Sequence, residues 1–306
     1  MKSKMDRMSL HVHMDSVWTY RNHVVGSGAS ERELNLYSDT AYTHMMPRLI
    51  SWAEQRDAKL TIFVVALDLM VPEHAELVKK WHSDGHEIAN HSWSHPPQFI
   101  ALSREETEIE VRKSHQAIHD LLGVPPRGYA APGWYDDRRI WTVLKELGYC
   151  YDASLLPSWV MLLQNFAVYA LSPALRNHLK MMRSDWKELL FGPSKVVPKS
   201  ADHVMRTPTP VAFFRLPFWH SLAFVLPHFI SSMLIKSCMN RRTENFYYVV
   251  HPLDFSDPVH DQLETGYLRS HISFDEKWAI WRRISENFSG KKIVTMSELL
   301  RCNSQD

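Results

Sequence analysis

The chain has 306 residues, of which 45% are hydrophobic and 23% are charged, a composition that excludes a disordered chain. Its 35 Lys and Arg nearly balance its 34 Asp and Glu, so the net charge of +1 gives no electrostatic reason to expect nucleic-acid binding. The length suits one large α/β barrel or two smaller domains.

Short apolar runs alternate with helical patterns along most of the chain. In chain order the sequence predicts a strand at 9–15, a helix at 37–56, a strand at 60–67, a helix at 73–83, a strand at 86–91, a helix at 103–123, a strand at 127–131, a helix at 136–148, a strand at 246–251, a helix at 274–288, a strand at 292–295 and a helix at 297–301. This repetition favours a parallel α/β sheet or barrel with helices outside. Functional residues of such folds lie at the carboxyl ends of the strands.

The middle of the chain interrupts this pattern. Residues 153–175 and 216–235 contain no Asp, Glu, Lys or Arg, and residues 176–206 between them carry seven Lys and Arg against three Asp and Glu. Prolines and polar residues interrupt both uncharged stretches, so neither is a good membrane-spanning helix. Two interpretations stay open for a single barrel domain over 1–306. An insertion at about 157–210 packs on the barrel, or it places apolar side chains in lipid beside a basic patch.

The cysteines and the N-terminus bear on the cellular compartment. Cys150, Cys238 and Cys302 form no CxxC motif and leave one cysteine unpaired. This number argues against a disulfide framework and favours a reducing compartment. The N-terminal residues are basic but contain no apolar run of the signal-peptide type, so we expect a cytoplasmic protein.

The strongest chemical signal is the segment HSWSH at 91–95, directly after a predicted strand. If the segment turns helically, histidines at i and i+4 lie on one face, so His91 and His95 could bind the same ion. Zn²⁺ takes nitrogen and oxygen ligands, and a catalytic zinc site uses three protein ligands and a water. A nearby carboxylate would complete such a set.

The surrounding motifs resemble those of the polysaccharide deacetylase family, the NodB-homology group of carbohydrate esterases. In chain order they are HVHMDS, GHEIANHSWSH, YAAPGW and YYVVHPLDF, and the C-terminal KIVTMSELL resembles the closing strand and helix of the family. The resemblance covers residues 8–156 and 211–300. It implies a distorted, incomplete (β/α) barrel and a metal-dependent hydrolase that removes an acetyl or formyl group from the nitrogen of a sugar or lipid-linked sugar.

The resemblance also implies roles for individual residues. Carried over position by position, Asp15, His91 and His95 would bind a divalent metal ion. Zn²⁺ is the expected ion, with Co²⁺ or another divalent ion as alternatives. His251 would be the general acid that protonates the leaving amine, and the N–H of Gly133 would help hold the oxyanion. Asp254, three residues after His251, could orient this acid.

Two positions depart from the family pattern. The general base of the family is usually an Asp that lies directly before the metal-binding Asp or two residues before it. Here Met14 is adjacent to Asp15, and His13 lies two residues earlier. Ala130 takes the place of the Arg that usually braces this base. Because that Arg would repel a protonated histidine, the two changes are consistent, and we predict His13 as the base. The alternative is that His13 only packs or supports a ligand and that the enzyme is slow or inactive.

The segment YAAPGW resembles the branch of the family that removes formyl groups from a lipid-linked aminoarabinose. That branch also lacks the Arg and works on the cytoplasmic face of the membrane. We therefore expect Pro132, Gly133 and Trp134 to contact an N-acylated carbohydrate, free or lipid-linked, and the protein to contact the inner membrane face peripherally. Trp18, Trp93 and Trp219 also fall near strand ends, where an aromatic face suits a sugar ring. The sequence carries no signal for the oligomeric state.

Two other functions stay open. Amidohydrolase and PHP-type metal barrels also carry an HxH pair on their first strand, as His11 and His13 do here. These enzymes hydrolyse phosphoesters or cyclic amides, often with two metal ions. The missing Asp and Arg would also fit a catalytically degenerate barrel that binds a glycan or a lipid-linked sugar. Two tightly bound metal ions would favour the first alternative, and sugar binding without turnover would favour the second.

Overall fold

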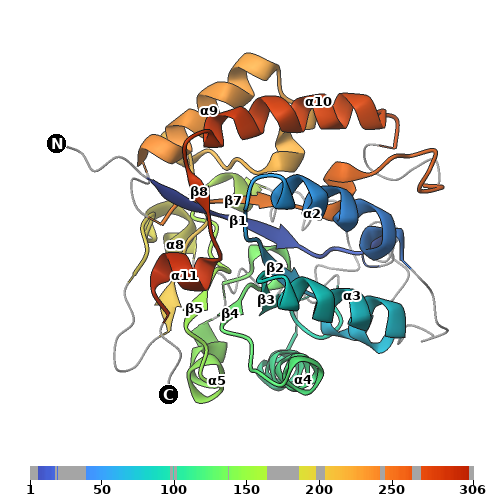
Figure 1. Ribbon diagram of the computed structural model, residues 1–306. Coiled ribbons are helices and arrows are strands. Elements are labelled where there is room, and N and C mark those ends of the chain that lie inside the picture. Colours follow the sequence, from blue (N-terminus) through green and yellow to red (C-terminus); the bar gives the residue numbers. More distant parts are fainter. Residues whose placement is uncertain are drawn as a thin grey trace, which may run out of the picture.

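Eight parallel strands form one curled sheet in the computed structural model (Figure 1). The structure describes residues 6–17, 19, 39–96, 99, 102–136, 138–163, 186–197, 204–241, 245–263 and 270–302. The strands are β1 (Arg7–His13), β2 (Thr61–Val64), β3 (Glu87–Asn90), β4 (Gly128–Tyr129), β5 (Tyr151–Asp152), β6 (Met205–Arg206), β7 (Tyr247–Val250) and β8 (Lys292–Ile293). Their order is β6-β5-β4-β3-β2-β1-β7, and β8 pairs with the start of β1.

Helices lie outside the strands, with α9 and α10 on one side and α4 and α5 on the other (Figure 1). The α-helices are α2 (Met46–Glu54), α3 (Pro72–Ser83), α4 (Arg104–Leu122), α5 (Trp141–Glu146), α8 (Trp186–Phe191), α9 (His228–Arg241), α10 (Phe274–Ser285) and α11 (Met296–Leu300). Shorter helical turns are η1 (Ala41–Met45), η2 (Ala66–Met70), η4 (Pro132–Trp134), η5 (Arg138–Ile140), η6 (Phe213–Arg215), η7 (His220–Phe224), η8 (Pro252–Phe255) and η9 (Glu286–Phe288). The predicted fold class, a distorted (β/α) barrel, is confirmed.

The barrel is incomplete because β6 and β7 stand at the two ends of the strand order. A side chain bridges these ends where a ladder of backbone hydrogen bonds would close a complete barrel. The Tyr247 hydroxyl of β7 donates to the carbonyl oxygen of Thr207, directly after β6, at 2.7 Å. All strands run parallel, so their carboxyl ends form one edge, and this edge carries the residues considered below.

Most predicted elements are present. The strands expected at 9–15, 60–67, 86–91, 127–131, 246–251 and 292–295 are found as β1, β2, β3, β4, β7 and β8. The helices expected at 73–83 and 103–123 are α3 and α4, and α4 starts with a capping box between Ser103 and Glu106. Residues 37 and 38 of the first expected helix lie outside the described residues. The sequence did not predict β5, β6, α8 or α9.

The expectation that the cysteines form no disulfide was wrong. Cys150, just before β5, and Cys302, just after α11, are bonded, with Cα atoms 6.1 Å apart and a sequence separation of 152 residues. Cys238 is free and buried. A count of cysteines could not show that two distant chain segments meet, so the count no longer supports a reducing compartment. The cytoplasmic location stays a prediction.

The middle of the chain is described only in part. Residues 164–185 and 198–203 lie outside the described residues, as does Trp18. Residues 205–206, within the range expected for the insertion, form β6 and pair with β5. The boundaries of the insertion therefore stay a prediction. Among the helices of the described ranges, none combines the length and the apolar character that crossing a membrane requires.

Candidate metal centre and active site

Three side chains from two strand ends converge at the carboxyl edge of the sheet. Asp15 follows β1, His91 follows β3, and His95 lies four residues further along. The Nε2 atoms of His91 and His95 are 3.5 and 3.3 Å from the same Oδ1 of Asp15. A tetrahedral ion with bonds of about 2.1 Å separates its ligand atoms by about 3.4 Å. These residues therefore have the spacing and the donor atoms that a Zn²⁺ site requires.

Hydrogen bonding fixes which nitrogen of His91 is available. The Nδ1 atom lies 2.7 Å from the carbonyl oxygen of Ala130. Because a carbonyl only accepts, Nδ1 carries the proton, and in the neutral ring the Nε2 lone pair faces Asp15. Burial is the largest effect on this ring and lowers the pKa of His91, which favours the neutral form. A histidine held in this way by a backbone carbonyl is typical of metal ligands.

Asp15 is held in its ionised form. Burial alone would raise the pKa of Asp15, but the imidazoles of His95 and His91 beside it, when protonated, keep the pKa well below its usual value. A carboxylate beside two histidine nitrogens is a donor set that suits a divalent cation. The residues present thus fit the ion that the fold family implies.

The loop that carries both histidines is not the helical turn that their spacing suggested. Ser92 and His95 have positive φ angles of 71° and 49°, so the chain bends instead of winding. The N–H of Ser92 donates to Asn90 Oδ1 at 2.7 Å, and the next two N–H groups donate to Glu110 of α4 at 3.0 and 2.9 Å. These bonds hold a conformation that costs energy for residues other than glycine.

His251 and a buried carboxylate form the other side of the site. His251 follows β7, and its Nε2 atom lies 3.8 Å from Asp15 Oδ2. Asp254 is fully buried, accepts the backbone N–H of His251 at 2.9 Å, and accepts the hydroxyl of Ser221 at 3.0 Å. Its Oδ2 is 3.8 Å from His251 Nδ1, so its charge stabilises the protonated ring. His251, with a buried carboxylate next to it, therefore stands directly beside the candidate metal ligands.

His13 lies at the end of β1, in the middle of this group. Its ring centroid is 4.7 Å from that of His91 and 5.7 Å from that of His251. Burial, and then the charges of His91 and His251, lower the pKa of His13 well below its usual value. The ring is therefore neutral, and the lowered pKa makes it a weak base. His11 instead stacks on Tyr247 at 3.9 Å and is not part of the group of candidate ligands.

Two aromatic rings line one side of these histidines. Trp134 lies 4.8 Å from Trp219 and 5.8 Å from His13, measured between ring centroids. Gly133 and Trp134 have positive φ angles of 64° and 57°, and Pro132 before them is buried. A Cβ atom on Gly133 would approach the ring of Tyr135 to 2.8 Å, so this turn requires glycine. Trp93 instead packs under the Lys113 ammonium, 3.9 Å from its ring centroid.

Sequence reasoning missed the residues that support the site. Asn90, Glu110 and Ser221 hold the histidine loop and the Asp254 carboxylate. Asn90 lies within the GHEIANHSWSH motif, and its position directly before His91 was a usable signal. Glu110 is one of several glutamates in α4, and nothing in the sequence distinguishes it from the others.

A second group of possible ligands lies away from the strand ends. His44, His260 and Asp261 bring their ligand atoms within 4.8 Å of one another. The Asp261 carboxylate, however, accepts two hydrogen bonds from the Arg48 guanidinium, at 2.7 and 2.8 Å. The positive charge beside Asp261 is therefore already supplied by Arg48, which makes this group a poor site for a metal ion.

Comparisons with known proteins agree with this geometry. Residues 27–151 match the family model described as Polysaccharide deacetylase. The chain is 27% identical over 227 residues to the peptidoglycan deacetylase of Helicobacter pylori, covering 70% of this chain and 74% of that protein. It is 30% identical over 102 residues to chitin deacetylase 1 of Cryptococcus neoformans, covering 33% of this chain but only 21% of that protein. A solved Mycobacterium smegmatis structure assigned as a polysaccharide deacetylase has a TM-score of 0.58 and 16% identity, over 98% of this chain and 90% of that one.

Proposed function

Since the chain belongs to the NodB-homology polysaccharide deacetylase family, we propose that it is a metal-dependent amide hydrolase. Its substrate would be an N-acylated sugar, free or lipid-linked, from which it removes an acetyl or formyl group. The observation that carries this proposal is the spacing of Asp15, His91 and His95: both histidine Nε2 atoms lie 3.3–3.5 Å from one Asp15 oxygen, and all three ligand atoms lie within 4.8 Å of one another. His11 packs against Tyr247 and is not among the candidate ligands, which argues against a second metal ion beside the first.

The metal would address the low reactivity of an amide. Asp15, His91 and His95 would hold a divalent ion, Zn²⁺ or Co²⁺, which when bound would polarise an amide carbonyl and lower the pKa of bound water to about 7. The protein residues would then move the protons. His13 is unprotonated and its ring centroid lies 4.7 Å from that of His91, so it would accept the proton of the attacking water, although its lowered pKa makes it a weak base. The N–H of Gly133 would hold the developing oxyanion.

His251 would complete the reaction as the acid. A departing amine is a poor leaving group unless it receives a proton. His251 lies within 3.8 Å of Asp15, and the buried Asp254 beneath it stabilises the protonated ring. The Ser221 hydroxyl donates to Asp254 at 3.0 Å and lies 3.4 Å from His251 Nδ1, so it would help orient the imidazole.

The sugar would pack on the aromatic rings. Trp134 and Trp219 form adjacent faces next to His13 and His251, and aromatic faces stack on the C–H groups of a pyranose ring. Pro132 and Gly133 would contact the acyl group from the backbone of η4. A lipid-linked sugar would present its carrier away from these rings.

Metal analysis combined with an amine-release assay tests the function. We expect one divalent ion per chain and free amine from a panel of N-acetyl and N-formyl sugars. His95→Ala should lose both the ion and the activity, because it removes a ligand. His13→Ala should keep the ion but lower kcat by about 10²–10⁴, because it removes only the base.

The exposed His271 gives a matched control, since His271→Ala should change neither quantity. Full activity in His95→Ala would contradict the proposed metal centre. An unchanged kcat and pH–rate profile in His13→Ala would exclude His13 as the base. Metal-loaded protein that binds these sugars without releasing amine would identify the catalytically degenerate alternative.

A further inference from the structure

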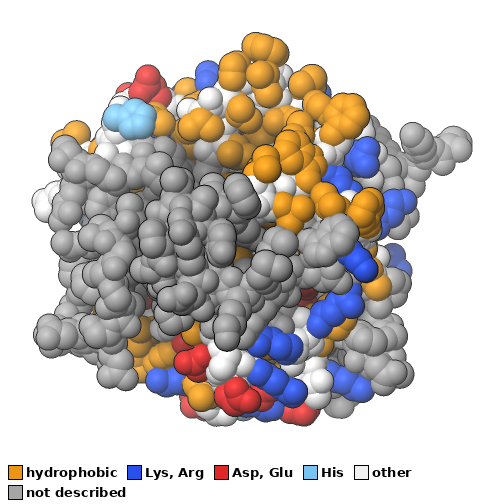
Figure 2. Space-filling model, turned by 180° about the vertical axis from the view of Figure 1, so that it is seen from behind, with side chains coloured by type: hydrophobic (Ala, Val, Ile, Leu, Met, Phe, Trp, Pro, Cys, Tyr) orange, Lys and Arg blue, Asp and Glu red, His pale blue; other side chains and the backbone are white. Residues whose placement is uncertain are grey.

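Large apolar side chains gather on one face of the molecule, beside Lys and Arg side chains (Figure 2). Phe214, Val225 and Phe229 are 81%, 72% and 71% exposed, and Met233 is also exposed. Phe229 and Met233 line one groove with Phe213, the neighbour of Phe214. Singly exposed apolar residues are common, but such a group marks an interaction surface. We call this group, together with the basic residues Lys236 and Arg241, the α9 face.

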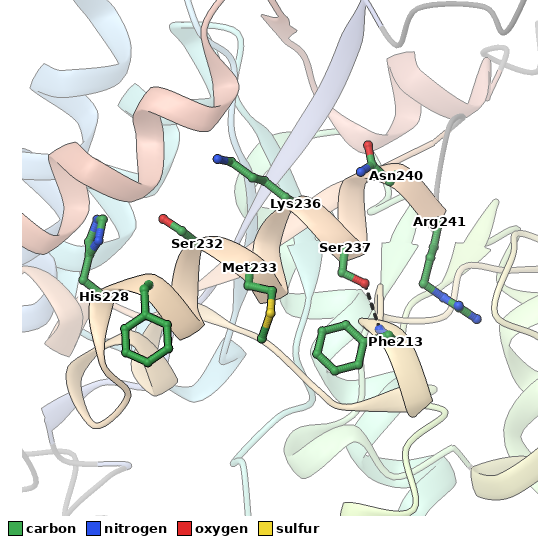
Figure 3. Close-up of a pocket in the computed structure, with 9 residues that line it drawn as sticks. Phe213, His228, Ser232, Met233, Lys236, Ser237, Asn240 and Arg241 are labelled. Atoms are coloured by element: carbon green, nitrogen blue, oxygen red, sulfur yellow. Dashed lines mark hydrogen bonds between the residues drawn. The ribbon is translucent and has the colours of Figure 1, made fainter.

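The core does not require the outer side of α9 to be apolar. The inner side of the helix buries four residues at helical spacing, namely Ser231, Leu234, Ile235 and Cys238. Phe229 and Met233 are exposed in the first half of the helix, and Lys236 and Arg241 are exposed near its end. Met233 and Arg241 point towards the turn at Phe213, whereas Lys236 points away from it (Figure 3). A helix at a solvent-exposed protein surface usually carries polar residues on its outer side. The exposed aromatic and aliphatic side chains of this helix therefore do not contribute to the hydrophobic core.

A rigid turn holds Phe214 on the same face. Phe214 and Arg215 have positive φ angles of 53° and 57°, a conformation that costs energy for both residues. The turn is fixed by hydrogen bonds from the Phe213 N–H to Ser237 Oγ at 2.8 Å and from Trp159 Nε1 to the Phe214 carbonyl at 2.9 Å. Between Phe213 and α9 lies a groove of ≈ 820 Å³ (Figure 3).

The charge of this region has one sign. Residues 203–243 contain no Asp or Glu, whereas Arg215, Lys236 and Arg241 all lie at or near the α9 face. A symmetric contact between two copies would place these cations opposite one another, which disfavours a dimer through this face. A surface with bound or fixed negative charges would complement it.

We propose that the α9 face docks on an anionic lipid bilayer. Phe214, Val225 and Phe229 would enter the boundary between headgroups and acyl chains, while Lys236 and Arg241 contact lipid phosphates. The same chain segment borders the candidate active site, because Trp219 packs on Trp134 and Ser221 bonds to Asp254. Docking would thus bring the candidate active site near the membrane. The idea that the site then acts on a lipid-linked substrate rests on the proposed function, whereas the docking itself is independent of that function.

Co-sedimentation of the full chain with vesicles tests the docking, without metal or substrate. We expect binding to phosphatidylcholine vesicles that contain about 30% phosphatidylglycerol, and weaker binding when NaCl rises from about 50 to about 500 mM. Lys236→Gln/Arg241→Gln should lower the partition coefficient about 25-fold, or about fivefold per charge. Phe229→Ser should lower it at least about tenfold, because it removes buried apolar area.

Controls on other faces match each change. Lys79→Gln/Lys80→Gln removes two exposed charges of α3, and Val259→Ser removes a residue that is 87% exposed. Both should bind vesicles as the unaltered chain does. Absence of binding at low salt, or equal losses in the control variants, would overturn the proposal. So would a reversible dimer in sedimentation equilibrium that Phe229→Ser abolishes, since it would identify a second copy as the occupant.

Discussion

His86, directly before β3, makes the stability of the fold depend on pH. Its Nδ1 atom accepts the backbone N–H of Leu60 at 3.0 Å, which requires an unprotonated nitrogen. Burial, with a contribution from Lys59, lowers the pKa of His86 to about 4. In an unfolded chain the pKa is about 6.5, so the unfolded state binds more protons between these values. The stability contributed by neutral His86 is thus complete above about pH 6.5 and is lost as the pH falls towards about 4.

We expect acidification from about pH 7 to about pH 4.5 to lower the free energy of unfolding through His86 by about 2 kcal/mol. Urea denaturation at several pH values measures this change. His86→Asn keeps an acceptor for the Leu60 N–H but does not titrate, so its stability should fall less over the same range. Identical pH profiles for the two chains would show that His86 is not responsible.

The sequence predicted the principal site residues because each lies at a strand end. Asp15, His91 and His251 follow apolar runs, and parallel strands bring such positions to one edge. The supporting contacts could not be predicted in the same way. His91 is hydrogen-bonded to the backbone carbonyl of Ala130. Every residue type has a backbone carbonyl, so the sequence could not indicate this contact. The bend at Ser92 needs a positive φ, for which serine gives no signal.

At the scale of elements, the packing of β4 against β5 depends on one glycine. Tyr151 of β5 lies across Gly128 of β4, and a Cβ atom there would come within 2.1 Å of the tyrosine ring. The tyrosine cannot easily move, because it is fully buried and its hydroxyl donates to Glu87 at 3.0 Å. Glycine is therefore required here because the tyrosine ring occupies the space of a Cβ atom, and not because of the backbone conformation.

Gly128→Ala should therefore lower the free energy of unfolding by about 3 kcal/mol, measured by urea denaturation. Gly148→Ala is the matched control. Gly148 has a φ of 78° but no atom within 4 Å of its Cβ position, so only backbone strain of about 1 kcal/mol is expected. If both variants lose the same amount, the tyrosine does not restrict this position.

The sequence missed β5, β6 and α9 for two different physical reasons. The strands β5 and β6 have two residues each, which is too short for an alternating pattern, and they are fixed by pairing with neighbours. Helix α9 is apolar on both sides in its first half, so it lacks the contrast that marks an amphipathic helix. By contrast, α4 combines a capping box with a long periodic pattern, and both of its ends were predicted closely.

At the scale of the whole molecule, the disulfide joins the C-terminal segment to the start of β5. Cys150 and Cys302 are 152 residues apart, and closing so long a loop restricts the unfolded chain strongly. We expect reduction to lower the free energy of unfolding by about 2–4 kcal/mol, measured by urea denaturation with and without a reductant. Cys302→Ser should unfold like the reduced chain and should not respond to the reductant. Equal stability of the oxidised and reduced chains would contradict this role.

The bond also bears on where the protein works. Disulfides persist in oxidising compartments and are rare in the cytosol, whereas the resemblance to the lipid-linked branch favours the cytoplasmic face of the membrane. The overall architecture was predictable without this bond, because strand–helix alternation alone indicates a parallel barrel. The meeting of Cys150 and Cys302 was not, since it depends on how α11 returns to the sheet.

Joining residues 150 and 302 turns about half of the polypeptide into a covalent ring. A protease that cuts one peptide bond within this ring opens it but releases no fragment. The cut protein would migrate as a single species on a non-reducing gel and separate into two pieces only after the sulfur bond is broken. Proteolytic damage to this half of the chain would therefore leave the strand ends and their histidines in one molecule.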